Sequence, residues 1–174
     1  MTLLDMLRRT ALALAISFAA GLLFVNVYNS VVDAASWGSN FPSSIEAMRS
    51  YFKDSNPSDF FRIASPLNQA IALAALILCW KASPRIRLLC GIALLLAIGG
   101  DMLTFGYFYP RNAILMHGSV TDQLDTIRQA QAQWAAMNWV RSAGVALNLA
   151  FDFAALFALS GPLNRRMAAG PLPA

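Results

Sequence analysis

The stretch TALALAISFAAGLLFVNVYNSVV, residues 10–32, decides the fold class because it runs for 23 positions without a charged side chain. An α-helix needs about 20 mainly apolar residues to cross the hydrocarbon core of a bilayer. Three further stretches have similar length and composition: residues 63–80, 88–109 and 138–161. Only 13% of the chain is charged and 57% is hydrophobic. We therefore expect an all-α membrane protein in which four transmembrane helices form an up-down-up-down bundle.

The basic residues predict the topology of this bundle. They cluster before the first span, between the second and third, and after the fourth: Arg8, Arg9, Lys81, Arg85, Arg87, Arg165 and Arg166. An even number of spans places these clusters on one side, which the positive-inside rule makes cytoplasmic. We expect a multi-pass inner-membrane protein with both termini in the cytoplasm. One domain covers 1–164, followed by a disordered cytoplasmic tail at 165–174.

An alternative for the N-terminus is a secretory signal, with Arg8 and Arg9 before an apolar segment. The apolar run is longer than a signal needs, and no small-x-small cleavage site follows it promptly. A transmembrane helix is therefore the preferred interpretation.

Both outward loops carry helical patterns. In SSIEAMRSYF, Ser43 and Glu46 have the spacing of a capping box, and Asn56-Pro57 should turn the chain back after this helix. In TDQLDTIRQAQAQW, Thr121 is the predicted N-cap. The row of Leu124, Ile127, Gln131 and Trp134 at helical spacing continues with Asn138 and Arg141 in the fourth span. One continuous helix should therefore protrude outward from the bilayer. Pro110 should kink the end of the third span.

Polar side chains form rows inside the predicted spans. Asn138, Arg141, Asn148 and Asp152 fall within about 80° of one another on a helix wheel. The other spans contribute Asn26, Asn68 and Asp101. Ionisable groups inside a membrane are costly unless they are paired or face water, and they commonly mark functional sites. We expect these rows to converge on a chamber in the outer leaflet, where either an Arg141–Asp101 ion pair or a polar cavity would offset the cost of the charges. Interhelical hydrogen bonding is the purely structural alternative.

Several kinds of site are not predicted. The single histidine, His117, lies in a loop and cannot supply the paired ligands of a haem between spans. Cys79 and Cys90 have no metal-site spacing and should be reduced packing residues. The basic residues are not interleaved with stacking aromatic residues as in a nucleic-acid surface. We therefore expect no metal, no cofactor and no nucleic-acid partner.

Three short segments carry a resemblance to a known family: SPLNQ at 65–69, YPRN at 109–112 and MNWVR at 137–141. Together with Trp134 they resemble the anthrone oxygenase-like family of small four-span membrane proteins, most of which have no assigned function. The resemblance implies a four-helix membrane fold. It also implies oxidation of the central carbon of an anthrone to a quinone by molecular oxygen, without an obvious metal motif.

The clustered polar rows suggest specific roles that are compatible with such a reaction. Arg141 would stabilise a developing oxyanion, with Asn138 and Asn112 as neutral donors. Asp101 would be the general base. Trp134 and Trp139 would stack against a flat ligand. Further substrate-binding candidates are Asn26, Asn68 and Tyr107.

The sequence leaves three functions open. The first is a membrane protein whose outward polar pocket binds or oxygenates a small lipophilic aromatic molecule. The second is a non-enzymatic scaffold or partner subunit, in which the polar rows only hold the bundle together. The third is a small proton-coupled carrier with Asp101 or Asp152 as the titrating group. The lipid bilayer is the one partner common to all three; a protein partner or homo-oligomer is not specified by the sequence.

Overall fold

The computed structural model describes the backbone of residues 2–168 and the side chains of residues 2–161. Its helices, including two short π-helical segments (η), are α1 (Leu3–Tyr28), η1 (Asn29–Asp33), α2 (Ala34–Trp37), α3 (Ser43–Tyr51), α4 (Pro57–Cys79), α5 (Pro84–Leu103), η2 (Thr104–Phe108), α6 (Tyr109–Met116) and α7 (Leu124–Ala168). Residues 169–174, most of the tail predicted to be disordered, lie outside this range.

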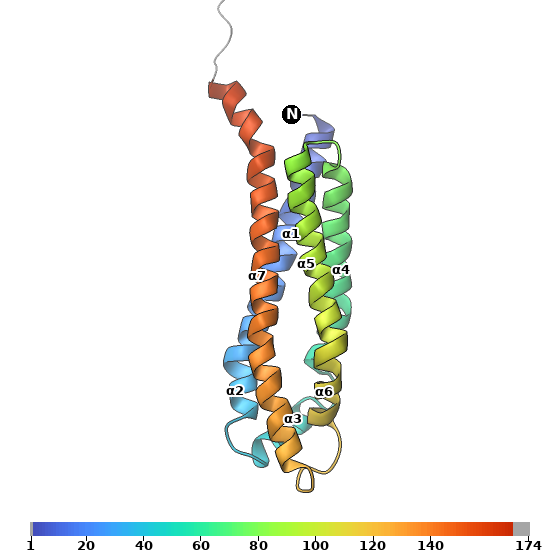
Figure 1. Cartoon of the computed structure of the whole chain (residues 1–174), viewed down its shortest axis with the longest axis vertical. Helices are drawn as coiled ribbons and strands as arrows, with labels where there is room; N and C mark the ends of the chain where they lie inside the picture. The colour runs from blue at the N-terminus through green and yellow to red at the C-terminus, as the bar shows by residue number, and fades with distance from the viewer. Residues whose placement is uncertain (1, 169–174) are drawn as a thin grey trace, which may run out of the picture.

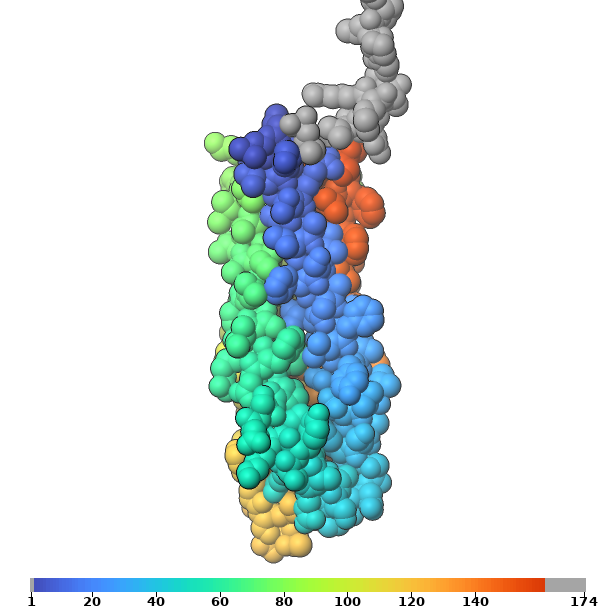
Figure 2. All heavy atoms as spheres, turned by 180° about the vertical axis from the view of Figure 1, so that it is seen from behind, coloured from blue at the N-terminus to red at the C-terminus, as the bar shows by residue number. Residues whose placement is uncertain are grey.

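Four helical stretches are long and apolar enough to cross a membrane: Leu3–Trp37, Pro57–Cys79, Pro84–Met116 and Leu124–Gly161. They confirm the predicted all-α membrane fold. Helices α1, α4, α5 and α7 form a ring in which each contacts its two neighbours. Figure 1 shows the start of α1, the α4–α5 connection and the end of α7 at one end of the bundle, and α2, α3 and α6 at the other. From behind, α1 and α4 lie side by side along the bundle (Figure 2).

The start of α4 differs from the prediction. Asn56 and Asp59 form a reciprocal capping box, in which the Asn56 side chain accepts from Ser58 N and Asp59 accepts from Asn56 N. With Pro57 at the first helical position, this cap starts α4 six residues before the predicted span. The capping box predicted at Ser43 is wrong, because α3 begins after Pro42 without a side-chain cap.

Helix α7 confirms the prediction of one continuous helix from the outer loop through the fourth span. Its 45 residues correspond to about 68 Å at 1.5 Å per residue, more than twice the hydrocarbon thickness of about 30 Å. The predicted cap at Thr121 is wrong, because α7 begins at Leu124 and the Thr121 hydroxyl instead pairs with Ser119, 3.1 Å away. The protruding part of α7 supports the short helices of the outer end.

Two π-helical segments interrupt the spans. Segment η1 lies between α1 and α2, and η2 lies immediately before the α6 helix that contains Pro110, where we expected a kink. A π turn contains an extra residue, so it rotates the faces of the helix that follows. Helix-wheel positions on either side of η1 and η2 are therefore not continuous.

Two apolar clusters hold the bundle together at different heights. The outer cluster joins α2, α3, α6 and α7 through buried side chains that include Trp37, Ile45, Leu115, Ile127 and Trp134. The second cluster lies nearer the chain termini and includes Leu12, Ala75, Cys79, Cys90 and Ala155. Both cysteines are buried and free, as expected for packing residues. Between the two clusters lies a polar layer.

Candidate functional site

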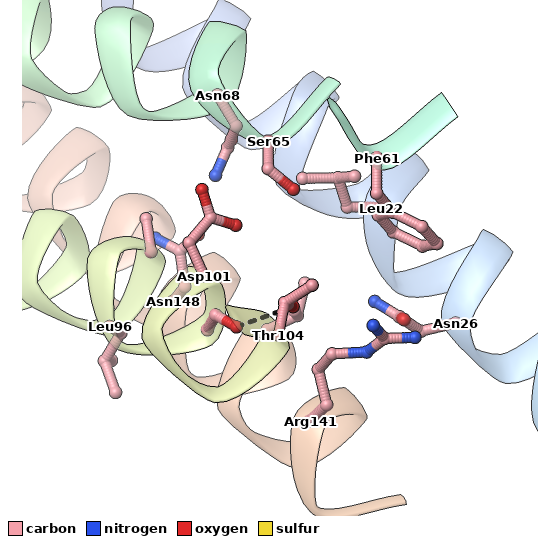
Figure 3. Close-up of a pocket in the computed structure, with 13 residues that line it drawn as sticks. Leu22, Asn26, Phe61, Ser65, Asn68, Leu96, Asp101, Thr104, Arg141 and Asn148 are labelled. Atoms are coloured by element: carbon pink, nitrogen blue, oxygen red, sulfur yellow. Dashed lines mark hydrogen bonds between the residues drawn. The ribbon is translucent and has the colours of Figure 1, made fainter. Parts of the chain in front are cut away.

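The polar layer encloses a small cavity to which all four long helices contribute. Its volume is about 30 Å³, enough for one or two water molecules. The side chains around it are Leu22 and Asn26 from α1, Phe61, Ser65 and Asn68 from α4, Leu96, Ala97, Gly100 and Asp101 from α5, Thr104 from η2, and Arg141, Val145 and Asn148 from α7. Figure 3 shows most of these side chains directed towards a common centre. The polar rows of four separate spans therefore converge, as the sequence predicts.

Arg141 is the most constrained charge in the cavity. It lies within a membrane-spanning helix, and it is only 7% exposed because its side chain points into the bundle. One terminal nitrogen donates to Asn138 Oδ1, and the guanidinium carbon lies 4.2 Å from the centre of the Phe108 ring and 4.8 Å from that of Phe61. Such contacts with aromatic faces stabilise a desolvated cation by about 2 kcal/mol. The Nε atom is buried and has no hydrogen-bond partner.

Asn138 fixes the position of Arg141 against α1. It is fully buried, and its amide nitrogen donates to the Asn26 carbonyl oxygen at 2.8 Å and to Ser30 Oγ at 2.6 Å. Its oxygen is then free to accept from Arg141. The Asn26 side-chain oxygen is buried without a partner, and Asn26 lines the same cavity as Arg141 (Figure 3). Two unsatisfied polar atoms, one donor and one acceptor, therefore belong to side chains of the same cavity wall.

Asp101 lines a different side of the cavity and does not pair with Arg141. Its carboxylate accepts a hydrogen bond from Gln69 Nε2 of α4. The three ion pairs among the described residues all involve other groups, so of the two expected arrangements, an Arg141–Asp101 ion pair or a polar cavity, the structure has the cavity. The reason is local, since Gln69 supplies a neutral donor to the carboxylate while Asn138 and the aromatic rings hold the guanidinium. The cavity separates the two charges.

Three predicted binding residues lie in a layer further out, away from the cavity lining. Trp134 Nε1 donates to Asn112 Oδ1 at 2.9 Å, and Asn112 Nδ2 donates to Ser58 Oγ at 3.2 Å. The Tyr107 ring is covered by the Arg111 guanidinium at 3.4 Å. The polar groups of Asn112 are thus committed to joining α4, α6 and α7. Trp134 contacts the site only through its ring, 5.9 Å from the Arg141 guanidinium carbon.

Trp139 is placed apart from the other candidates. It is 52% exposed and is absent from the cavity lining, because adjacent residues on an α-helix point about 100° apart and Asn138 faces inward. Its exposed indole faces the surroundings of the bundle. The predicted stacking of Trp139 on a shared ligand with Trp134 therefore does not fit this geometry.

A family model described as anthrone oxygenase matches residues 59–151, more than half of the chain. The chain belongs to the anthrone oxygenase family. The searches of curated proteins and of solved structures find no significant match.

The segment matched by the anthrone oxygenase model holds most of the site. It contains Phe61, Asn68, Asp101, Asn138 and Arg141. Helix α1 lies before the matched segment and closes the remaining side of the cavity. In this member of the anthrone oxygenase family, the site is therefore completed by a helix outside the matched region.

Two features of the site were not found from the sequence. Phe61 and Ser65 line the cavity, but Phe61 precedes the predicted second span and Ser65 lies at its start, because α4 begins at the Asn56 cap, six residues before that span. Ser30 receives the Asn138 amide, and its small hydroxyl gave no signal among the apolar residues around it. The capping pattern of Asn56 and Asp59 was the signal that could have placed α4 correctly.

The polar layer continues inward from the cavity to a buried carboxyl group. Asn148 lines the cavity, and its amide donates to the Ala93 carbonyl oxygen and to Asp152 Oδ2, both at 3.2 Å. Asp152 is only 2% exposed. Within residues 2–161, no three His, Cys, Asp or Glu side chains are grouped closely enough to share a metal ion.

Proposed function

We propose that this anthrone oxygenase family member binds a small lipophilic aromatic molecule at the cavity between α1, α4, α5 and α7 and oxygenates it. The observation that carries this proposal is the buried Arg141, whose Nε lacks a hydrogen-bond partner in a cavity that is also lined by Asn26, whose side-chain oxygen is unpartnered too. Leaving a buried polar group without a hydrogen bond costs about 1–3 kcal/mol, and more for a charged one. A bound oxygen-containing ligand would offset that cost.

The reaction implied by the family converts a ring CH₂ group to a carbonyl. With O₂ as oxidant, the carbon loses two hydrogens and gains one oxygen atom, and the second oxygen atom leaves as water. In the proposed reaction, the Asp101 carboxylate removes the first proton from the CH₂ carbon. The Arg141 guanidinium binds the oxygen on which negative charge then develops. Asn138 positions that guanidinium, because its own amide hydrogens are engaged by α1.

A three-ring molecule requires more room than the cavity of about 30 Å³ provides, since sites for such ligands usually enclose about 300 Å³ or more. Leu22 of α1 and Phe61 of α4 lie next to each other at one side of the cavity (Figure 3). We propose that a lipid-dissolved substrate enters by separating these two side chains. Phe61 would then exchange its contact with Arg141 for a contact with the ligand.

We also propose that the end carrying both termini faces the cytoplasm and that the membrane is the inner membrane. The basic residues at this end, Arg8, Arg9, Lys81, Arg85 and Arg87, support this orientation. The cavity would then lie in the outer half of the bilayer. Cysteines introduced separately into the α4–α5 and α6–α7 connections of intact cells should react with an impermeant reagent only at the α6–α7 connection.

The test is quinone formation by the purified protein. Anthrone is supplied in detergent with O₂, and anthraquinone is followed by absorbance together with oxygen uptake. We expect one O₂ consumed per quinone, and a loss of about 100-fold or more in rate for Arg141→Ala, the effect typical of removing an oxyanion donor. Arg128→Gln, which changes an exposed cation on the same helix, is the matched control. Equal rates for the wild type and Arg141→Ala would refute the proposal.

A structural role is the second candidate, and the small cavity favours it. Most buried polar groups are paired, as in Asn138 and Asn148, and interhelical hydrogen bonds stabilise membrane bundles by about 0.6 kcal/mol each on average. If the protein is a scaffold, Arg141→Ala should change thermal stability while no anthrone-dependent oxygen uptake is detected in the wild type.

A further inference from the structure

A second hollow lies on the outside of the bundle, between α4 and α5. It is a groove of about 450 Å³ bordered by Leu76 of α4, by Trp80 directly after α4, and by Pro84, Arg87, Leu88, Gly91, Ile92 and Leu95 of α5. The border includes strongly exposed side chains, such as Leu88 at 63% and Leu95 at 68%. The groove therefore opens towards the surrounding lipid and is separate from the cavity at Arg141.

Gly91 lines the groove and has no side chain to fill it. A Cβ atom added at Gly91 would meet no atom within 4 Å, so the glycine leaves space that a larger residue would fill. The residues of α5 that border the groove run from Pro84 to Leu95, about 16 Å along the helix axis at 1.5 Å per residue. An extended, apolar channel of this length fits a stretch of acyl chain.

The only ionisable side chain bordering the groove within the described part of the chain is basic. The Arg87 guanidinium carbon lies 5.1 Å from the centre of the exposed Trp80 ring. Lys81 in the α4–α5 connection and Arg85 in the first turn of α5 are also exposed. None of these three cations takes part in an ion pair among the described residues. A tryptophan beside unpaired cations at the end of an apolar groove is the arrangement expected at a membrane–water interface.

We propose that this groove binds an anionic phospholipid, with one acyl chain along Gly91 and the headgroup phosphate at Arg87. A zwitterionic lipid would fill the same groove but would gain less from Arg87, because each basic residue near a membrane surface adds about 1 kcal/mol of attraction to anionic lipid. A second copy of this chain would have to bring an acidic group to Arg87. The charges therefore favour a lipid.

The test is native mass spectrometry of the purified full chain with phosphatidylglycerol or phosphatidylcholine carrying identical acyl chains. The wild type should bind phosphatidylglycerol more tightly. Arg87→Gln should lower that affinity about fivefold, the effect of one charge, and should weaken phosphatidylcholine binding by a smaller factor. Gly91→Leu should weaken binding of both lipids. The matched control is Gly99→Leu, also at a glycine of α5 whose Cβ would meet open space, which should bind both lipids as the wild type does.

Two results would overturn the proposal. One is an unchanged preference for phosphatidylglycerol in Arg87→Gln. The other is unchanged lipid binding in Gly91→Leu, including the case in which this variant instead shifts a dimer to a monomer, which would assign the groove to a second copy. Circular dichroism and thermal denaturation of each variant establish that it is folded. Neither substitution touches the cavity at Arg141, so the outcome is independent of the proposed oxygenation.

Discussion

Replacing Arg141 with methionine distinguishes two roles for its guanidinium, binding a ligand or holding the helices together. The substitution keeps an unbranched apolar stem of similar length and removes the guanidinium. If the guanidinium serves a ligand, the bundle gains little from it, and the variant should fold normally but lose activity. If the guanidinium holds the helices together, its removal should destabilise the bundle.

The size of the stability change can be worked from the contacts. The variant loses one charge-assisted hydrogen bond to Asn138, about 1.5–3 kcal/mol, and the aromatic contacts with Phe108 and Phe61, about 2 kcal/mol. It also removes the cost of a charge within the membrane, about 2.5–3.5 kcal/mol. These effects nearly cancel. We expect a net destabilisation of at most about 2.5 kcal/mol, which lowers the Tm of a chain of this size by at most about 5–10 °C.

The assay combines thermal denaturation in detergent with anthraquinone formation from anthrone and O₂. Arg141→Met should keep a Tm close to that of the wild type and lose about 100-fold or more in rate. Arg128→Met, which removes an exposed cation from the same helix, should change neither quantity. A fall in stability of more than about 3 kcal/mol, the range for breaking a buried ionic interaction, would refute the reasoning. So would a stable variant with wild-type activity.

Three further predictions concern stability. Asn138→Ala should lower the free energy of unfolding by about 2 kcal/mol, because it removes two bonds to α1 and the acceptor of Arg141; an unchanged Tm would contradict this. Arg49→Ala should speed backbone hydrogen exchange around residues 114–118, since the Arg49 guanidinium donates to four carbonyl oxygens there. Unchanged hydrogen exchange at residues 114–118 in this variant would show that the Arg49 hydrogen bonds do not stabilise this segment. Asn56→Ala should destabilise the start of α4 by about 1 kcal/mol, whereas Ser43→Ala, at the incorrectly predicted cap, should have little effect on Tm.

Residue periodicity predicted the bundle well because long apolar segments have few alternatives in a membrane. The run at residues 10–32 could only cross the bilayer as a helix, since hydrocarbon offers no partner for an open backbone. The row from Ile127 to Arg141 predicted that α7 is continuous, and its members are buried in the structure. The convergence of Asn26, Asp101 and Arg141 followed because a polar side chain avoids lipid.

The contacts within the site were harder to predict than its position. Periodicity places Arg141 and Asp101 at similar depths but carries no information about Gln69 and Asn138, which hold the two charges apart. The MNWVR motif suggests that Trp139 binds the ligand, although its side chain points about 100° away from that of Asn138 on the helix. Here the periodicity was the better guide, because the direction of a side chain on a regular helix is set by backbone geometry.

The most direct test of the account is an experimental structure of the protein in lipid with anthraquinone, the product-like ligand. The account predicts density between α1, α4, α5 and α7, with a ligand oxygen within hydrogen-bonding distance of Arg141 and with Phe61 displaced from the guanidinium. An unoccupied cavity with Phe61 still covering Arg141, or a guanidinium turned towards the acyl chains, would contradict it.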